Sequence, residues 1–244
     1  MTTPPATPTG PTTRVATRRE RARAETTAEI LDAARAQLRE VGAAQLSLRA
    51  VAGALGMSPA GLYRYYDSRE ALLTALIAEG FDALASAVGE ARTAVGDRDL
   101  TDQLYAAALA FRDWGLAHPH EFGLLYGDPI PGYAAPADGP TSAASRRVGV
   151  ALLPPLVHAW RAGRLRVPAL SGTPDAATRR WAAALDPDLP VPAAAAIMGL
   201  WTRLHGLVVL EVFGHLRWLG PDTGPLARAQ LEALVGELIA PAPS

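Results

Sequence analysis

The sequence predicts an all-α protein in which a small N-terminal helix-turn-helix domain precedes a larger C-terminal helical domain. The first observation behind this prediction is that apolar residues recur at intervals of three and four, and never alternate at a period of two as in a half-buried strand. The second is that Ser, Asp and Gly stand where these periodic stretches begin and stop. With 244 residues, 49% of them hydrophobic, the chain can bury a core in one or two domains.

The charged residues divide the chain into two regions of opposite sign. Residues 1–70 hold 10 Arg and 7 acidic residues, whereas residues 71–244 hold 13 Arg and 17 acidic residues. A positive N-terminal region suits a polyanionic partner, and a negative remainder does not.

Composition also excludes several classes of protein. The absence of cysteine rules out a disulfide framework, a thiolate metal site and a cysteine nucleophile, and it fits a reducing compartment. Residues 1–10 lack a charged leader followed by an apolar stretch, so no secretory signal is expected. The longest strongly apolar run, residues 204–216, is too short and too polar to span a bilayer. We therefore expect a cytoplasmic protein with no membrane partner.

Residues 1–18 are rich in Thr and Pro and are expected to form a disordered arm. Five arginines gather near the end of this arm: Arg14, Arg18, Arg19, Arg21 and Arg23. They are either the solvated start of a helix or contacts to phosphates or a minor groove, and both interpretations stay open. The first helix is predicted over residues 22–41, where Gly42 can close it in the left-handed conformation.

Two short helices, joined by a three-residue turn, are predicted next. Ser47 can cap the first of them, and Gly56 can end it. Its apolar positions follow helical spacing: Leu48, Val51, Ala52 and Leu55. Ser58 with Pro59 after it opens the second, which is predicted to run to Tyr66.

The outer side of this second helix has an unusual composition. It carries the small Ala60 and Gly61 beside Tyr63, Arg64 and Tyr65. Small side chains let the backbone approach another surface, and the long polar ones donate hydrogen bonds. This composition is therefore more typical of a helix that enters a DNA major groove than of a helix that faces only solvent.

The remainder of the chain is predicted to be helical. Asp67 and Glu70 form a capping box for a long helix over residues 69–92. Further helices are expected over residues 99–117, 119–126, 142–163, 193–217 and 223–239, with a kink at Pro154 and Pro155. Residues 127–140 are expected to be a loop, and residues 164–192 a proline-punctuated segment with a helical turn near 175–184.

Four strings of residues in one register resemble the TetR-type family of bacterial one-component transcriptional regulators. They are ILDAA at 30–34, LSLRAVA at 46–52, LGMSPAGLYRYY at 55–66 and SREALL at 68–73. The chain departs from the family pattern at Tyr66, where Phe is usual, and at Arg69, where Lys is usual. The resemblance implies a helix-turn-helix DNA-binding domain over residues 19–68 and a helical ligand-binding and dimerisation domain over residues 69–240.

Two further strings point to one subclass of that family. WTRLHGL at 201–207 resembles the tryptophan-histidine-glycine signature of a C-terminal subclass, and AHPHEF at 117–122 resembles its helix break.

The resemblance also implies which residues contact double-stranded DNA. Pro59, Ala60 and Gly61 would face base edges, and Arg64 would take a guanine or a phosphate. The phosphate contacts would come from Ser47, Arg49, Tyr63, Tyr65 and Arg69. The whole DNA-binding set is Ser47, Arg49, Ser58, Pro59, Ala60, Gly61, Tyr63, Arg64, Tyr65 and Arg69. One module presents few base contacts, so a homodimer is expected to bind a palindromic operator with half-sites about 34 Å apart. The last two helices would form the dimer as a four-helix bundle, or else simply close a monomer core.

Large flat side chains in the C-terminal region are candidates for an effector pocket. The candidate set is Phe111, Trp114, His118, Phe122, Tyr126, Trp160, Trp201 and His205. Aromatic residues at helical spacing can equally be plain core. A small-molecule effector filling the pocket would tilt the long helix and release the operator, which is the mode of action of a repressor.

Two other classes of function are weighed against this one. His118, His120 and Glu121 suggest metal ligands, but they straddle a proline without a third ligand at a recognisable interval, so no enzyme activity, catalytic residue, metal or cofactor is expected. The alternative is a helical protein-interaction or ligand-binding module without operator binding. A steep fall of DNA affinity with salt would separate a regulator from such a module.

Overall fold

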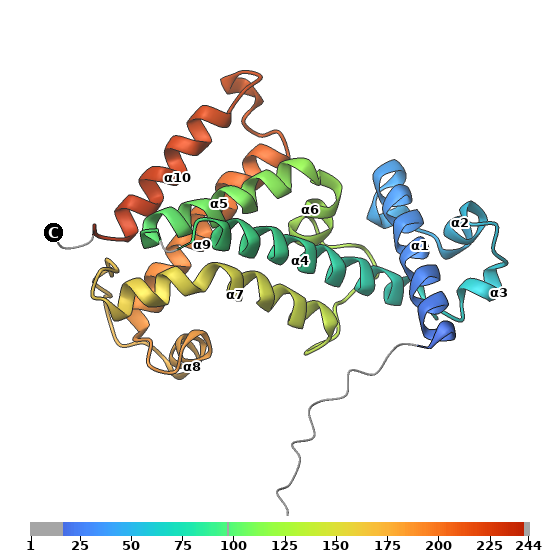
Figure 1. The fold of residues 1–244 in the computed structure, drawn as a ribbon, viewed down its shortest axis with the longest axis horizontal. Helices are drawn as coiled ribbons and strands as arrows, with labels where there is room; N and C mark the ends of the chain where they lie inside the picture. The colour runs from blue at the N-terminus through green and yellow to red at the C-terminus, as the bar shows by residue number, and fades with distance from the viewer. Residues whose placement is uncertain (1–16, 97, 242–244) are drawn as a thin grey trace, which may run out of the picture.

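The computed structural model describes residues 17–96 and 98–241 and confirms the all-α fold within those ranges (Figure 1). The helices are α1 (Arg18–Val41), η1 (Ala43–Gln45), α2 (Leu48–Ala54), α3 (Pro59–Leu62), α4 (Arg69–Ala94), α5 (Leu100–Ala117), α6 (Pro119–Tyr126), α7 (Pro140–Arg161), α8 (Ala176–Leu185), α9 (Val191–Val212), η2 (Arg217–Leu219) and α10 (Gly224–Leu238). The extended pairing among these residues is a single isolated antiparallel bridge between Leu165 and Ile239.

Helix α1 begins earlier than the sequence predicts. Thr17 and Glu20 form a capping box, in which the Thr17 hydroxyl accepts from the Glu20 amide and the Glu20 carboxylate accepts from the Thr17 amide. The prediction that residues 17 and 18 belong to the arm is therefore wrong, since Arg18 is helical. Residues 1–16, which include the rest of the expected arm and Arg14, lie outside the described part of the chain.

The helix-turn-helix is confirmed, with a shorter second helix. Gly56 lies in the left-handed region at φ 63°, and the Met57 amide donates to the Ala52 carbonyl at 2.9 Å, which closes α2. The Ser58 hydroxyl accepts from the Gly61 amide and caps α3. Helix α3 ends at Leu62, so the prediction that it continues to Tyr66 is wrong; the chain continues in turns there.

Helix α4 is capped one residue later than expected. The Ser68 hydroxyl accepts from the Ala71 amide at 3.0 Å, so Ser68 takes the capping role that the sequence assigned to Asp67. Two separate cores meet along this helix. Residues of α4 up to Leu76 pack with α1, α2 and α3, and those from Ile77 onward pack with the remaining helices. The boundary between the two cores therefore lies inside one continuous helix.

The larger core belongs to the C-terminal body. Helix α4 packs along α5 and α7, and α9 crosses them behind, as Figure 1 shows. Helix α7 continues through Pro154 and Pro155 to Arg161. Helix α9 stops at Val212, five residues before the predicted end, because Gly214 adopts the left-handed conformation at φ 72°.

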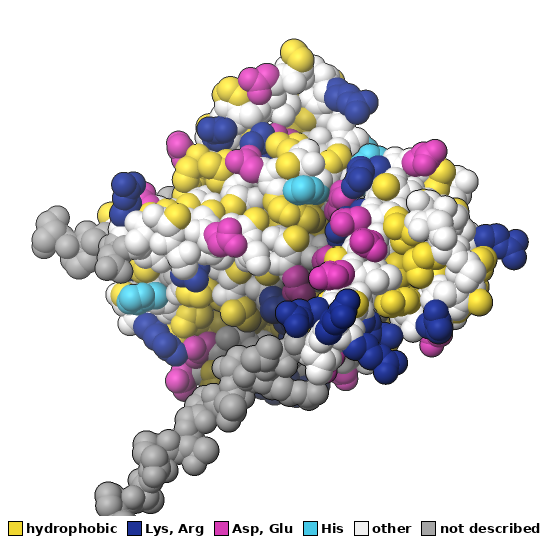
Figure 2. Space-filling model, turned by 45° about the vertical axis from the view of Figure 1, so that its right-hand side comes forward, with side chains coloured by type: hydrophobic (Ala, Val, Ile, Leu, Met, Phe, Trp, Pro, Cys, Tyr) yellow, Lys and Arg dark blue, Asp and Glu magenta, His cyan; other side chains and the backbone are white. Residues whose placement is uncertain are grey.

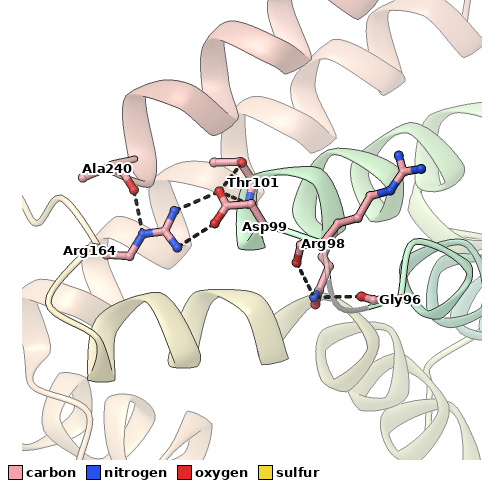
Figure 3. Close-up of polar contacts among 7 residues, drawn as sticks. Gly96, Arg98, Asp99, Thr101, Arg164 and Ala240 are labelled. Atoms are coloured by element: carbon pink, nitrogen blue, oxygen red, sulfur yellow. Dashed lines mark hydrogen bonds and ion pairs between the residues drawn. The ribbon is translucent and has the colours of Figure 1, made fainter. Parts of the chain in front are cut away.

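The C-terminal segment is fastened to the segment after α7. The two terminal nitrogens of Arg164 donate to the Asp99 carboxylate at 2.7 and 2.8 Å, and its Nε donates to the Ala240 carbonyl at 2.8 Å (Figure 3). Hydrogen bonds from Arg164, and then from Thr101, hold the pKa of Asp99 well below its usual range. This arrangement joins the start of α5, the end of α7 and the end of α10.

Two apolar helices are longer than the run of residues 204–216 noted in the sequence. By length and composition alone, α4 and α9 could cross a membrane. Both helices supply buried residues to the larger core, including Leu84 from α4 and Leu204 from α9. Their apolar character is accounted for by packing inside the helical bundle.

Candidate nucleic-acid interface and ligand pockets

The amino-terminal turn of α3 brings backbone to the surface of the molecule. Ser58, Pro59 and Ala60 are exposed, whereas Leu62 at the end of the turn is fully buried and fixes α3 to the small core. A Cβ atom placed on Gly61 would lie 3.3 Å from the Ser58 hydroxyl that caps the helix. Small residues at these positions therefore let the backbone of α3 approach another molecule closely and leave the capping hydrogen bond undisturbed.

Tyr63 and Tyr65, which follow α3, have different surroundings. Tyr63 is 52% exposed, which is high for an aromatic side chain. Tyr65 is half-buried, packs against the small core, and lies under the Arg23 guanidinium at 5.0 Å from its ring centroid. Arg23 also donates to the Arg64 carbonyl at 3.5 Å. Arg23 therefore ties α1 to the turn after α3.

Arginine side chains without an acidic partner surround α3. Arg49 and Arg64 are exposed, and neither makes an ion pair within residues 17–96 and 98–241. The Ser47 amide donates to Gln37 Oε1 at 3.0 Å, and its hydroxyl makes no capping hydrogen bond. Figure 2 shows further Arg side chains gathered on this side of the molecule; those at the start of α1 are Arg18, Arg19, Arg21 and Arg23.

Arg69 does not fit the phosphate-binding role implied by the family resemblance. Its guanidinium turns inward and donates to the carbonyls of Ala43, Ala44 and Leu46 at 2.8, 3.1 and 3.0 Å. These carbonyls belong to the segment that joins α1 to α2. Arg69 therefore links the start of α4 to that segment, and we revise its role from a DNA contact to a structural cross-link.

Five of the eight predicted ligand residues form one aromatic cluster. They are Phe111, Phe122, Tyr126, Trp201 and His205, with ring centroids 4.6 to 6.4 Å apart. The rings come from α5, α6 and α9 and pack edge-on or tilted, as aromatic pairs prefer. They are thus brought together as expected, but they contact one another directly.

The polar groups of this cluster are held in unusual states. His205 Nδ1 is buried and has no hydrogen-bond partner among the described atoms. Burial lowers the pKa of His205, so the imidazole is neutral at pH 7, and burial likewise raises the pKa of the Tyr126 phenol. The cluster therefore holds an acceptor or donor without a partner inside an apolar setting.

The other three predicted ligand residues lie elsewhere. Trp160 packs against the large core without joining the cluster. Trp114 stacks with His118 at 5.0 Å, and both line a polar cleft of about 410 Å³ between α1 and the body. Arg39 and Glu121 form an ion pair across this cleft at 3.3 Å. The cleft is a contact zone between the two domains.

A partly open apolar cavity of about 160 Å³ lies between α7, α8 and α9. Trp201 of the aromatic cluster forms part of its wall, opposite Trp181 of α8. The remaining lining residues are Gly149, Leu152, Leu153, Leu156, Leu185, Ile197, Met198, Leu200 and Leu204. No charged side chain lines this cavity, so it can take only an apolar group.

Several large apolar side chains are exposed at the C-terminal end of the sequence. They are Met198, Leu210 and Phe213 near α9, Trp218 and Leu219 in η2, and Leu226 of α10. Trp218 is 79% exposed. An apolar surface of this kind is typical of a face that another protein covers.

Sequence reasoning missed the contacts that α1 makes with α4 and with the start of α2. Arg35 of α1 pairs with Glu79 of α4, and Gln37 holds the start of α2. Charge spacing on α1 could have suggested that Arg35 faces a partner, but no sequence signal identified which one. Among the residues described, no three His, Asp or Glu side chains gather as a metal site would require.

Comparison with known families supports this arrangement. Residues 30–76 match the family described as bacterial regulatory proteins, tetR family, and residues 104–234 match the tetracyclin repressor-like C-terminal domain. The HTH-type transcriptional regulator Rv1816 of Mycobacterium tuberculosis (strain ATCC 25618 / H37Rv) is 35% identical over 235 residues, covering 93% of this chain and 97% of that protein. Regulator Mb1846 of Mycobacterium bovis (strain ATCC BAA-935 / AF2122/97) matches equally well.

Solved structures share the fold. The regulatory protein SCO4313 is 32% identical with a TM-score of 0.70, and the alignment covers 90% of this chain and 100% of that one. A protein of unknown function from Rhodococcus sp. RHA1 is 23% identical with a TM-score of 0.66, covering 87% of this chain and 94% of its own.

Proposed function

This chain belongs to the TetR family of bacterial regulatory proteins, and from that we propose that it binds a palindromic DNA operator as a homodimer and releases it when a small-molecule effector binds. One observation carries the proposal: Pro59 and Ala60 of α3 and the following Tyr63 are exposed, and the exposed Arg49 and Arg64 have no acidic partner among the described residues. A protein has little reason to leave such a surface open unless an external polyanion covers it.

The DNA contacts divide into two kinds. Pro59, Ala60 and Gly61 lie against base edges and thymine methyl groups in the major groove. Ser47, Arg49 and Tyr63 bind the phosphates that flank it. Arg64 is the side chain best suited to guanine, since its guanidinium is exposed and makes no ion pair with any acidic residue that the structure describes. Tyr65 supports this surface from behind through its contact with Arg23.

The dimer forms through α9 and α10. Their exposed apolar side chains, together with Trp218, offer a face that a second copy would cover. Two helices from each copy then make a four-helix bundle, which sets the distance between the two α3 helices.

The effector enters the C-terminal body beside Trp201. This residue belongs both to the aromatic cluster and to the wall of the apolar cavity. Trp201, His205 and Gly206 are also the residues that suggest the tryptophan-histidine-glycine subclass. A protein of the same fold, AibR, has been crystallised with isovaleryl coenzyme A and operator DNA together, at 18% identity and a TM-score of 0.52. That neighbour supports a regulator that holds an effector and an operator.

The protein acts as a repressor by occupying a promoter. It works in the cytoplasm and has no enzyme activity. Selection of bound sequences from random duplexes would identify the operator. Fluorescence anisotropy on that duplex should then show affinity falling roughly 10³- to 10⁵-fold between 50 and 200 mM salt, as expected for 6–10 neutralised phosphates. Weak association that salt does not affect would support the alternative, a helical interaction module without operator binding.

The effector part of the proposal has its own test. Trp201→Ala and His205→Ala should each change the dose of inducer that releases the operator, while affinity without inducer stays the same. An unchanged dose response in both variants would remove these residues from the effector site.

A further inference from the structure

A third pocket, which shares no lining residue with the apolar cavity, lies at the junction of the two domains. It is about 340 Å³ in volume and opens between α4, α6, the first turns of α7, and residues 127–139, which we term the connecting loop. Ile77 and Phe81 of α4 and Leu125 of α6 form its apolar wall. None of its lining residues lines the cavity beside Trp201. We refer to it as the junction pocket.

The opposite wall of the junction pocket is polar. Thr141, Ser142 and Ser145 bring three hydroxyl groups from the first two turns of α7. Thr141 is only 4% exposed, and its hydroxyl has no hydrogen-bond partner in the part of the chain that the structure describes. A buried hydroxyl in that state costs stability unless something bonds to it. This wall therefore lacks a hydrogen-bonding group that a ligand could supply.

The start of α7 adds donors to the same wall. Pro140 has no amide hydrogen, and the first helical hydrogen bond of α7 runs from Ala143 to the Gly139 carbonyl. The amides of Thr141 and Ser142 therefore precede the helix ladder, as the first amides of any helix do. Together with the Thr141 hydroxyl, they favour an oxygen acceptor at this point.

Charge limits which acceptor the junction pocket can take. The charged residue that lines it is Asp128 of the connecting loop. A carboxylate or phosphate ligand would meet this negative charge with no basic side chain to offset it. From these features we propose that the junction pocket binds an uncharged amphiphile, whose hydroxyl or carbonyl oxygen bonds to Thr141 and whose hydrocarbon part lies against Ile77 and Phe81.

The connecting loop carries the effect of binding to the DNA-binding domain, and this step rests on the proposed function. Ile130 and Tyr133 line the junction pocket and also pack against the small core, which α1, α2 and α3 share with the first turns of α4. The Tyr133 hydroxyl shares a hydrogen bond with Thr74 of α4 at 3.1 Å. A molecule in the junction pocket therefore contacts the residues on which the helix-turn-helix rests.

Binding can be measured on the free full-length protein by isothermal titration calorimetry with octan-1-ol and octanoate as probes. The two probes share a chain and differ in charge. Octan-1-ol should bind, and octanoate should bind at least about tenfold more weakly at pH 7. Equal affinities would overturn the proposal, because they would mean that the polar wall and Asp128 do not select the ligand.

Thr141→Val tests the anchoring group, because it keeps the shape and removes the unpartnered hydroxyl. Affinity for octan-1-ol should fall about fivefold, the value of one hydrogen bond, while the Tm stays level or rises. Gly149→Leu is the matched control, since it fills the other cavity, where a Cβ on Gly149 meets nothing within 4 Å. Loss of octan-1-ol binding in Gly149→Leu, or full binding in Thr141→Val, would overturn the proposal.

The link to DNA is measured separately with the selected operator duplex. Octan-1-ol should lower operator affinity in the wild type. Thr74→Val removes the hydrogen-bond partner of the Tyr133 hydroxyl from outside the pocket lining, so it should weaken this effect without changing octan-1-ol affinity. Binding of octan-1-ol with no change in operator affinity would refute transmission through the connecting loop. A chain that binds no duplex at all would refute the proposed function and leave the calorimetric result standing.

Discussion

Arginine is used differently in the two domains. In the body, Arg112 and Arg164 each make a two-pronged ion pair, with Glu211 and Asp99, that joins separate helices. Around α3, Arg49 and Arg64 are exposed without an acidic partner in the described ranges. Arg112 and Arg164 therefore cross-link helices inside the body, whereas Arg49 and Arg64 remain available to an anion outside the molecule.

Helix α1 shows both uses of arginine within one element, one at each end. Arg35 and Arg39 turn toward the body and pair with Glu79 and Glu121. Arg18 and Arg19 at the other end of the same helix are exposed. One helix therefore contributes both internal cross-links and free cations.

The largest effect is expected where a paired arginine is buried. The side chains of Arg112 and Glu211 are 6% and 1% exposed, and Thr223 also donates to Glu211. Arg112→Met should lower the free energy of unfolding by about 3–5 kcal/mol, because it leaves a buried carboxylate without its partner. Urea unfolding followed by circular dichroism measures this loss.

Arg203→Met is the control, since the exposed pair of Arg203 with Glu237 should contribute at most about 1 kcal/mol. Similar losses in the two variants would mean that burial does not set the value of these pairs.

Arg69 lies in the N-terminal region but is used as an internal cross-link, and a variant can test this assignment. Arg69→Ala leaves three backbone carbonyls without their donor, so the free energy of unfolding should fall by about 1–3 kcal/mol. Operator affinity of the folded fraction should keep its salt dependence. A stable Arg69→Ala variant with a shallower salt slope would instead make Arg69 a phosphate ligand.

The unpaired arginines should show the reverse pattern. Arg49→Ala should reduce operator affinity about tenfold and lower the slope of log K against log salt by about 1, with unfolding free energy within about 0.5 kcal/mol of wild type. Fluorescence anisotropy and urea titration provide the two measurements. Arg180→Ala, an exposed arginine of α8, should change neither. If both variants lose affinity equally, net charge and not the α3 surface controls binding.

The smallest effect concerns acid. Arg164 depresses the pKa of Asp99 in the folded chain, so the pair stabilises the fold above the ordinary carboxyl pKa, near 4, and this contribution is lost as pH falls below it. The Asp99 side chain is 37% exposed, so screening by water keeps the effect small. In thermal melts between pH 7 and pH 3, Asp99→Asn should flatten the decline of Tm. A decline as steep as that of the wild type would show that other carboxylates dominate.

Much of the fold could be predicted because local signals and the final packing agree. The stripe of Leu72, Leu73 and Leu76 is buried as expected, and Ser58 caps α3. The errors fall at helix ends, where several polar residues compete for one role. Ser68, and not Asp67, caps α4 because its hydroxyl accepts a hydrogen bond from the Ala71 amide. Local sequence cannot decide such a competition.

The candidate sites were predictable in composition and less so in geometry. Residue spacing predicted that Trp201 and His205 share one face of a helix, and their ring centroids lie 5.0 Å apart. Spacing could not show that Arg69 turns toward carbonyls 23 to 26 residues earlier, because that depends on how α1 and α4 pack. It also could not reveal the junction pocket, which forms only when the connecting loop folds back on α4.

The continuity of α4 across both cores makes it a lever with arms of unequal length. At 1.5 Å per residue, about 12 Å of the helix lies on the helix-turn-helix side of Leu76 and about 27 Å lies in the body. A tilt about Leu76 therefore moves the end that carries Ser68 less than half as far as the remote end at Ala94. A displacement deep in the body therefore reaches the helix-turn-helix reduced in size. Such a small displacement can change DNA binding only if the spacing between the two α3 helices of a dimer is narrowly defined.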